Sequence, residues 1–184
     1  KLSGGKGGCL AIKTDGTLWG WGGNWSGQLG NGNKTNYSPP IQIGSETDWT
    51  DIGIGGNTGM GIRGGKFFTM GGREANGQDW VTSSSPVQIG TATNWTSCNA
   101  AADNSFAIAG GAFYATGNGG GVNGDGTTSV RRTFVQVGSL TDWSKACGLG
   151  SNGYTAMALK TDGTIWGWGY NYNGILAANS GTNY

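Results

Sequence analysis

The fold is decided by the segment Ala11-Ile-Lys-Thr-Asp-Gly-Thr-Leu-Trp-Gly-Trp-Gly22, which returns almost unchanged as Ala158-Leu-Lys-Thr-Asp-Gly-Thr-Ile-Trp-Gly-Trp-Gly169. The two copies lie 147 residues apart, which corresponds to three periods of 49. In a chain with such a period, each unit is one supersecondary structure that buries its apolar face against its neighbours. The chain is therefore read as a series of stacked repeats.

Two further landmarks share the phase of this segment. The triplet Gln-(Ile/Val)-Gly occurs at residues 42–44, 88–90 and 136–138, and the pair (Asp/Asn)-Trp occurs at 48–49, 94–95 and 142–143. Both landmarks step by 46 and then by 48 residues. We therefore predict a single repeat domain over residues 1–184, with about three and three-quarter repeats of 46–49 residues at approximately 1–49, 50–95, 96–143 and 144–184.

The sequence of each repeat predicts short β-strands. The apolar segments 9–13 and 17–21 flank Asp15-Gly16, a pair that favours a tight hairpin because both turn residues tolerate positive φ. Residues 40–43 and 49–52 read as two more short strands, and the Trp positions 19 and 21 fall on one face. Four short strands in about 45 residues are typical of a propeller blade, so the predicted fold class is all-β.

Composition excludes several classes of protein. The chain has 40 Gly in 184 residues but only 3 Pro, and the glycines do not recur every third residue as collagen requires. The absence of His removes the commonest general base and most mixed zinc sites. A net charge of +1 without a basic block argues against nucleic-acid binding, and no apolar run reaches membrane-helix length. We expect no enzyme activity, no cofactor, no metal site and no membrane insertion.

Two local motifs and the cysteines have structural interpretations. The pattern GxGxxG at residues 59–64 lies where a strand is expected and opens no helix, so it does not predict a nucleotide site. The segment 123–127 is similar to a calcium loop but aligns with the ordinary loop 30–33 and lacks a closing Glu. Cys9, Cys98 and Cys147 form no disulfide or metal pattern, and we expect them to be small buried residues.

The repeats resemble those of the regulator-of-chromosome-condensation family, in its bacterial and viral style. The resemblance rests on residues 159–169, on Asn24-Trp-Ser-Gly-Gln-Leu-Gly30, on Pro40-Ile-Gln-Ile-Gly44 and on Ala146-Cys147-Gly148. It covers the whole chain, strongly in the first and last repeats and weakly in the middle two. That family often has a His where this chain has Gly8 and Thr155, which we interpret as a structural difference.

The resemblance implies a β-propeller that serves as a binding scaffold. Members of the family form seven-bladed rings, and this chain holds about half of that number, so we expect a partial ring or arc. An open arc exposes apolar faces between blades. The expectation is therefore that the chain is part of a longer protein, or that copies assemble to complete a ring or stack.

Candidate binding residues are those that break the phase of the repeat, because recurring residues are explained by the fold. Aromatic side chains and Arg dominate protein contact sites. The alternative for Trp25 and Trp80 is that they cap the core. The candidates are Trp25, Trp80, Arg131, Arg132, Tyr37, Tyr170 and Tyr172.

The predicted function is a non-enzymatic scaffold that binds a protein partner or assembles with itself. Its expected setting is an extracellular surface or a phage-like virion, as an assembly or attachment component. Two alternatives stay open: a soluble regulator of one target protein, as inhibitor or exchange factor, and a glycan-binding module.

Overall fold

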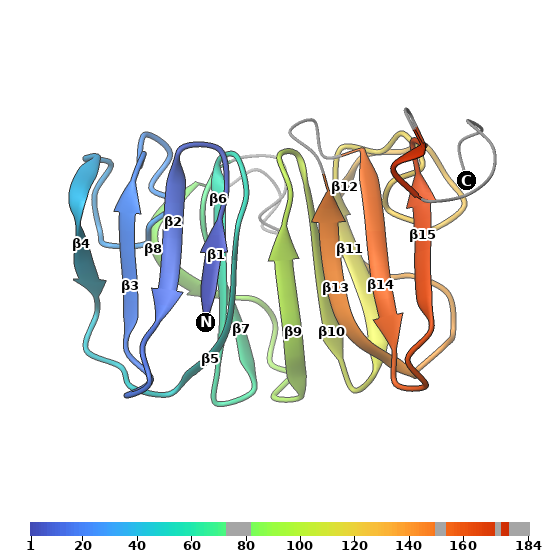
Figure 1. The fold of residues 1–184 in the computed structure, drawn as a ribbon, viewed down its shortest axis with the longest axis horizontal. Coiled ribbons are helices and arrows are strands. Elements are labelled where there is room, and N and C mark those ends of the chain that lie inside the picture. Colours follow the sequence, from blue (N-terminus) through green and yellow to red (C-terminus); the bar gives the residue numbers. More distant parts are fainter. Residues whose placement is uncertain (73–81, 150–153, 172–173, 177–184) are drawn as a thin grey trace.

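The structure is a computed structural model that describes residues 1–72, 82–149, 154–171 and 174–176. Within these residues every extended regular element is a β-strand, and the strands form four antiparallel sheets, here called blades 1 to 4 (Figure 1). Blade 1 contains β1 (Leu2–Gly4), β2 (Gly8–Ile12), β3 (Leu18–Gly22) and β4 (Tyr37–Ile43). Blade 2 contains β5 (Trp49–Ile54), β6 (Thr58–Arg63), β7 (Lys66–Gly71) and β8 (Ser83–Gln88). Blade 3 contains β9 (Trp95–Ala100), β10 (Asn104–Ala109), β11 (Ala112–Gly117) and β12 (Arg131–Gln136). Blade 4 contains β13 (Trp143–Leu149), β14 (Thr155–Lys160) and β15 (Ile165–Gly169).

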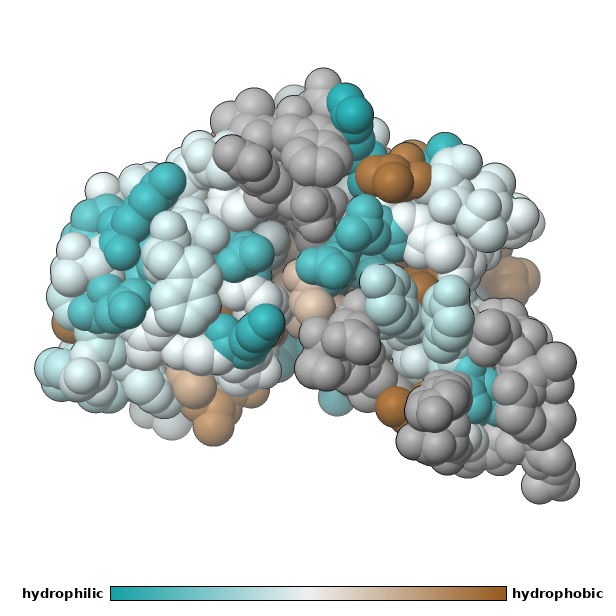
Figure 2. All heavy atoms as spheres, turned by 90° about the horizontal axis from the view of Figure 1, so that it is seen from above, coloured by the Kyte–Doolittle hydropathy of each residue, from teal (hydrophilic) through white to brown (hydrophobic). Residues whose placement is uncertain are grey.

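Each blade packs on the next one along the chain, and the molecule is arched when it is seen from above (Figure 2). In each blade the strands pair in chain order, and the first strands of successive blades, β1, β5, β9 and β13, pack against one another along the inside of the arc. The predicted all-β fold built from propeller blades is therefore confirmed. No helix in the described residues is long and apolar enough to cross a membrane.

The hairpin of the repeated segment forms where the sequence predicts it, and its loop contains Thr14 in addition to Asp15 and Gly16. Residues Gly8–Ile12 pair with Leu18–Gly22, and Gly16 has the left-handed φ of 80° that glycine adopts without strain. The amide of Gly16 donates to the carbonyl of Lys13, and the amide of Lys13 donates to Thr17. Asp15 accepts hydrogen bonds from the amide and hydroxyl of Thr17. The turn is thus a three-residue loop closed by a side chain.

The two other landmarks have structural roles that recur from blade to blade. In each Gln-x-Gly triplet the Gln side-chain amide donates to the Gly carbonyl, at 3.2 Å for Gln42, 2.9 Å for Gln88 and 3.2 Å for Gln136. In each (Asp/Asn)-Trp pair the Trp amide donates to a hairpin glycine of the preceding blade. These bonds are Trp49 to Gly16 at 3.3 Å, Trp95 to Gly65 at 3.0 Å and Trp143 to Gly111 at 3.0 Å.

The hydrophobic core lies between blades rather than within them. In the junction of blades 1 and 2, Leu10, Leu18 and Leu29 are fully buried against side chains of the second blade, among them Ile52, Phe68 and Met70. Burial of apolar surface between sheets is the main favourable contribution to their packing. The repeat therefore needs large apolar groups at the same places in successive units.

One buried carboxylate ties the inner strands together. Asp51 is 4% exposed, forms an ion pair with Lys1 of blade 1 and accepts a 3.0 Å hydrogen bond from the amide of Cys98 in blade 3. A buried charge requires such partners, because leaving water without compensation is costly. Asp51 thus joins three blades.

The expectation for the cysteines is correct for Cys98 and wrong for Cys147. Cys98 is buried, and burial raises the pKa of its thiol to about 12. Cys9 is half-buried, whereas Cys147 is exposed. Cys98 lies in β9, which has an inner strand on either side, but in the described residues no further inner strand lies beyond β13 to cover Cys147.

Candidate functional site

The candidate residues that the structure describes lie at one edge of the molecule. Strands in a meander alternate in direction, so the loops after the first and third strand of every blade emerge at the same edge, the upper one in Figure 1. This edge carries Trp25, Tyr37 and Tyr170, together with Arg131 and Arg132 at the start of β12. Trp80 and Tyr172 lie outside the described residues.

A groove opens at this edge above the inner strands, and we call it the axial groove. Its volume is about 430 Å³. It collects side chains from all four blades, because the loops that leave the four inner strands meet there. The groove is lined by Lys6, Trp25, Gly56, Asn57, Ala102, Asp103 and Tyr154.

Trp25 is the main apolar group of the axial groove. Its side chain is 52% exposed, and its indole nitrogen donates a 3.1 Å hydrogen bond to the side-chain oxygen of Asn57 in blade 2. The six-membered ring of the indole lies against Gly7 and Gly23, where a Cβ atom would press into it. Trp25 belongs to none of the buried clusters of the described residues. The ring is thus held in place with part of its surface facing solvent.

Two tyrosines of blade 4 extend the aromatic surface. The rings of Tyr154 and Tyr170 lie 5.3 Å apart between centroids, and the side chains are 40% and 44% exposed. The backbone holds them side by side, because the amide of Tyr170 donates to the carbonyl of Tyr154 at 2.9 Å. Exposed tyrosines on a fixed backbone offer a large contact area at low cost in conformational entropy.

Tyr37 and Arg131 have roles within their own blades. Tyr37 packs against the core between blades 1 and 2, and its hydroxyl accepts a 3.0 Å hydrogen bond from Asn33. Arg131 forms a 2.6 Å ion pair with Asp125 and also donates to Thr127. Neither residue lines the axial groove. The adjacent Arg132 is exposed.

The loop similar to a calcium site is closed by protein groups. Burial of the Asp125 carboxyl is the largest influence and acts to raise its pKa, but hydrogen bonds from Arg131 and Thr127 outweigh it and hold the pKa below its usual value. Both carboxylate oxygens of Asp125 have protein partners, Thr127 on one and Arg131 on the other. The residues described in this loop therefore act as a local brace for the start of β12.

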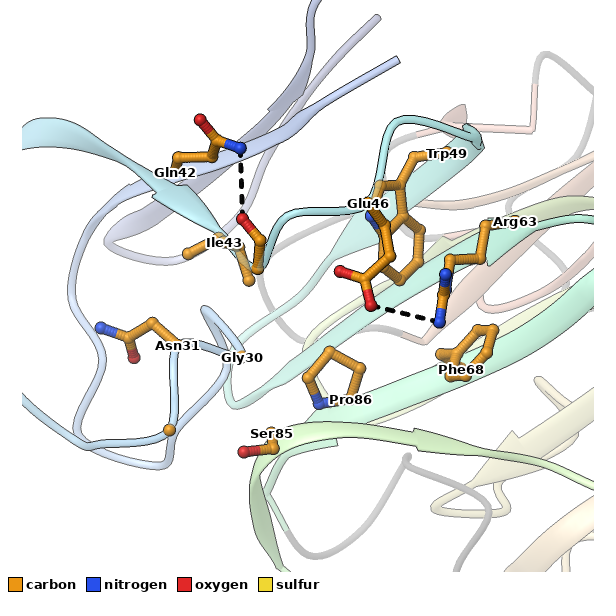
Figure 3. Close-up of a pocket in the computed structure, with 12 residues that line it drawn as sticks. Gly30, Asn31, Gln42, Ile43, Glu46, Trp49, Arg63, Phe68, Ser85 and Pro86 are labelled. Carbon is orange, nitrogen blue, oxygen red and sulfur yellow. Dashed lines mark hydrogen bonds and ion pairs between the residues drawn. The ribbon is translucent and has the colours of Figure 1, made fainter.

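A second cavity, of about 350 Å³, lies between blades 1 and 2 at the outer rim (Figure 3). Arg63 lines this cavity. The central carbon of its guanidinium group lies 5.5 Å from the ring centroid of Trp49 and 5.1 Å from that of Phe68. The guanidinium group is neutralised by Glu46 at 3.3 Å and Asp48 at 3.4 Å. A cation held over aromatic rings and paired with carboxylates is a structural brace, because its own charge is already compensated.

The same brace recurs in blade 4. Lys160 pairs with Asp142 at 3.1 Å and lies over the rings of Trp143 and Trp166. A third cavity of about 450 Å³ borders these rings, between blades 3 and 4. Because the brace repeats with the blades, we assign it to the fold and regard the axial groove as the candidate site.

Three groove residues were not anticipated from the sequence. Lys6, Asp103 and Tyr154 lie in loops that follow three different inner strands, up to 148 positions apart in the chain. An alignment of the repeats could have identified these three residues as a group, because each lies in the connection between the first and second strand of its blade. Their convergence becomes visible only when the blades are arranged around an axis.

Comparison with known proteins identifies the repeat. Residues 15–62 match the family model described as the regulator of chromosome condensation (RCC1) repeat. No curated protein sequence matches the chain. The match confirms the resemblance inferred from the repeated segment.

Solved structures show the same fold. Human WBSCR16 superposes with a TM-score of 0.84 and 18% identity, over 100% of this chain and 50% of that one. Yeast RCC1 (Prp20), solved in complex with Kap60, superposes with a TM-score of 0.74 and 20% identity, over 93% of this chain and 43% of that one. Prp20p of Saccharomyces cerevisiae, studied for its binding to Gsp1p and histones, gives the same score and identity over 93% and 44%. The chain spans about half the length of these proteins.

Proposed function

Because residues 15–62 are an RCC1 repeat and the described chain has the fold of RCC1-type propellers, we propose that the protein is a binding scaffold that engages a protein partner through the axial groove. The observation that supports this proposal is a set of exposed aromatic rings that line the groove, with Trp25 from blade 1 and Tyr154 from blade 4. Lys6 and Asp103 place both signs of charge beside these rings.

This composition fits a protein partner. Binding energy in protein interfaces concentrates in Trp, Tyr and Arg at the centre of the contact, and charged groups at the rim set orientation and specificity. Yeast RCC1 offers a precedent on the same fold, since its structure was solved with the protein Kap60 bound.

The test is affinity capture from an extract of the source organism, quantified by mass spectrometry. We expect Trp25→Ala and Tyr154→Ala each to reduce capture of the specific partner at least tenfold, because each removes an aromatic anchor of the groove. The matched control is Trp166→Ala, since Trp166 is 51% exposed but lies outside the groove. The same proteins captured equally by all four chains would contradict the proposal.

A second candidate function is glycan binding, favoured by the position of Trp25. One side of its ring system rests on backbone glycines, and the polar side chains of Asn57 and Asp103 line the same groove. We expect a bound sugar to change the tryptophan fluorescence of the wild-type chain in a titration across a glycan panel, and Trp25→Ala to abolish that change. Emission unaffected by every glycan would count against this candidate.

We also propose a setting for the scaffold. We place it at a surface or in a virion-like particle, as an assembly or attachment component, because exposed aromatic rings held by a repeat scaffold suit attachment to another protein. The alternative of a regulator of one target protein uses the same groove. The captured partner decides between them: a coat or envelope protein supports the first, and an enzyme or GTPase supports the second.

A further inference from the structure

The cavity of about 350 Å³ between blades 1 and 2, which we call the rim cavity, depends on side chains that differ between junctions. In the junction of blades 2 and 3, the ring of Phe134 packs on Phe67 and Trp95 at centroid distances of 5.0 and 6.4 Å. By strand register, Phe134 corresponds to Pro86 of blade 2, and Phe67 corresponds to Leu18 of blade 1. Smaller side chains thus stand where two phenylalanine rings fill the next junction, and Pro86 lines the space that stays open.

One carboxylate of the rim cavity also breaks the repeat. Glu46 occupies a position at which the next two repeats have Ala92 and Leu140. The cation of the brace, Arg63, already pairs with Asp48 at 3.4 Å, and Glu46 adds a second carboxylate at 3.3 Å. Because two other repeats fold with an apolar side chain at this position, the fold does not require Glu46, and its carboxylate is a candidate for recognition.

A buried hydrogen-bond donor lies beside this carboxylate. Trp49 lines the rim cavity and is 5% exposed, and its Nε1 has no hydrogen-bond partner among the described residues. In Figure 3 this nitrogen lies on the side of the ring toward Glu46. Nε1 of Trp95 and Nε1 of Trp143 are likewise unpartnered in the described chain, but Phe134 packs on the ring of Trp95. A buried donor without a partner is costly, and at Trp49 the cavity has room for an acceptor.

The other walls leave these two groups as the polar anchors of the rim cavity. Ile43 and Phe68 are buried and form its apolar part. The side-chain amides of Asn31 and Gln42 are engaged by neighbours in the chain. The guanidinium of Arg63 faces two carboxylates, so the brace carries one negative charge in excess.

We propose that the rim cavity binds a neutral carboxamide group, carried by a small molecule or by an Asn or Gln side chain of a partner protein. The carbonyl oxygen of the ligand accepts a hydrogen bond from Trp49 Nε1, and its amino group donates to Glu46. The volume of about 350 Å³ is near the lower end for ligand sites and suits a short ligand. The site goes beyond the proposed function, because the rim cavity and the axial groove share no lining residue.

The wall chemistry distinguishes a carboxamide from ligands of similar size. A carboxylate would add a like charge beside Glu46 and Asp48. An ammonium has donors only, so it would leave Trp49 Nε1 without an acceptor. A hydroxyl has its donor and acceptor on one oxygen atom. A carboxamide holds them on two atoms of one plane, which matches two separate groups on the wall.

The test is an NMR titration of the isotope-labelled full chain with propionamide, propionate, propylammonium and 1-propanol, which are similar in size. The readout is the indole N–H signal of Trp49. We expect propionamide to shift this signal with a dissociation constant at least about tenfold lower than the other three probes, because it alone pairs with both anchors. The indole signal of Trp95 is the internal control and should not move, since Phe134 packs against that ring.

Two variants copy side chains that other repeats of the chain contain. Glu46→Ala introduces the residue found at position 92, and we expect it to weaken propionamide binding at least about tenfold. Pro86→Phe introduces the residue found at position 134 and should abolish binding by filling the cavity. Leu140→Ala is the matched control, at the position of Glu46 in another repeat, and should leave binding unchanged. Urea denaturation verifies that each variant is folded.

Partner capture identifies the source of the carboxamide. Loss of a captured protein with Glu46→Ala assigns the group to that protein, and unchanged capture assigns it to a small molecule. Three results would overturn the proposal: a Trp49 signal that propionamide does not shift, equal responses to the four probes, or propionamide binding that Glu46→Ala leaves intact. None of them bears on the axial groove, because Trp25 and Tyr154 are unchanged in these variants.

Discussion

Replacement of Leu29 by Ala should lower the free energy of unfolding by roughly 2–5 kcal/mol, although Leu29 lies in a loop and not in a strand. The side chain is 0% exposed and fills the junction between blades 1 and 2. Its removal loses transfer free energy and leaves a cavity that the packed sheets cannot close. Its amide is held by the side chain of Asn24 at 3.0 Å, so the loop has little freedom to collapse into the space.

Urea denaturation of the two chains at equal concentration measures this effect. The matched control is Leu140→Ala, at a loop leucine that is 47% exposed, and it should change the free energy of unfolding by less than about 0.5 kcal/mol. Equal losses for the two variants would show that the loop 23–36 does not contribute to the core.

Replacement of Gly55 by Ala should be comparably destabilising, by about 3 kcal/mol or more, for a steric reason. A Cβ atom at Gly55 would meet the backbone carbonyl of Ala101 in the next blade, and backbone cannot move aside as a flexible side chain can. Overpacking of this kind forces neighbouring elements apart. The added methyl group should therefore separate blades 2 and 3 at the upper edge.

The thermal midpoint and the denaturant midpoint of Gly55→Ala report this separation. Gly4→Ala is the control, because its Cβ would meet only the Cys9 sulfur, at the ordinary contact distance of 3.8 Å. A Gly55→Ala chain as stable as Gly4→Ala would mean that the junction between blades 2 and 3 is looser than the structure shows.

Much of the fold is predictable from the sequence, because the strands and the landmarks repeat in phase. The hairpin at 8–22 follows from Asp15-Gly16 and the flanking apolar segments, and the all-β class follows from four such segments per repeat. The prediction missed what depends on the packing of one blade on another. Leu29 reads as a loop residue, and Asp51 is one acidic residue among ten, yet both are buried in junctions.

The candidate site is less predictable for a related reason. Trp25 and Tyr170 break the phase of the repeat, and both lie at the upper edge beside the inner loops (Figure 1). Tyr37 and Arg131 meet the same criterion, but their side chains are engaged in the structural core and in an ion pair. A departure from the repeat pattern identifies variable positions. It does not indicate which loops of different blades lie close together in the folded chain. Lys6, Asp103 and Tyr154 come from three blades, and only the curvature of the arc brings them together.

The inter-blade contacts described above join only consecutive sheets, and this has a thermodynamic consequence. A chain in which each unit touches only its neighbours gains stability as the sum of the units and of the junctions between them. Among the described residues, blades 2 and 3 have a junction on both sides, because each packs on the preceding and on the following sheet. A substitution that opens one junction should therefore loosen the two blades that meet there before it affects a blade farther along the chain.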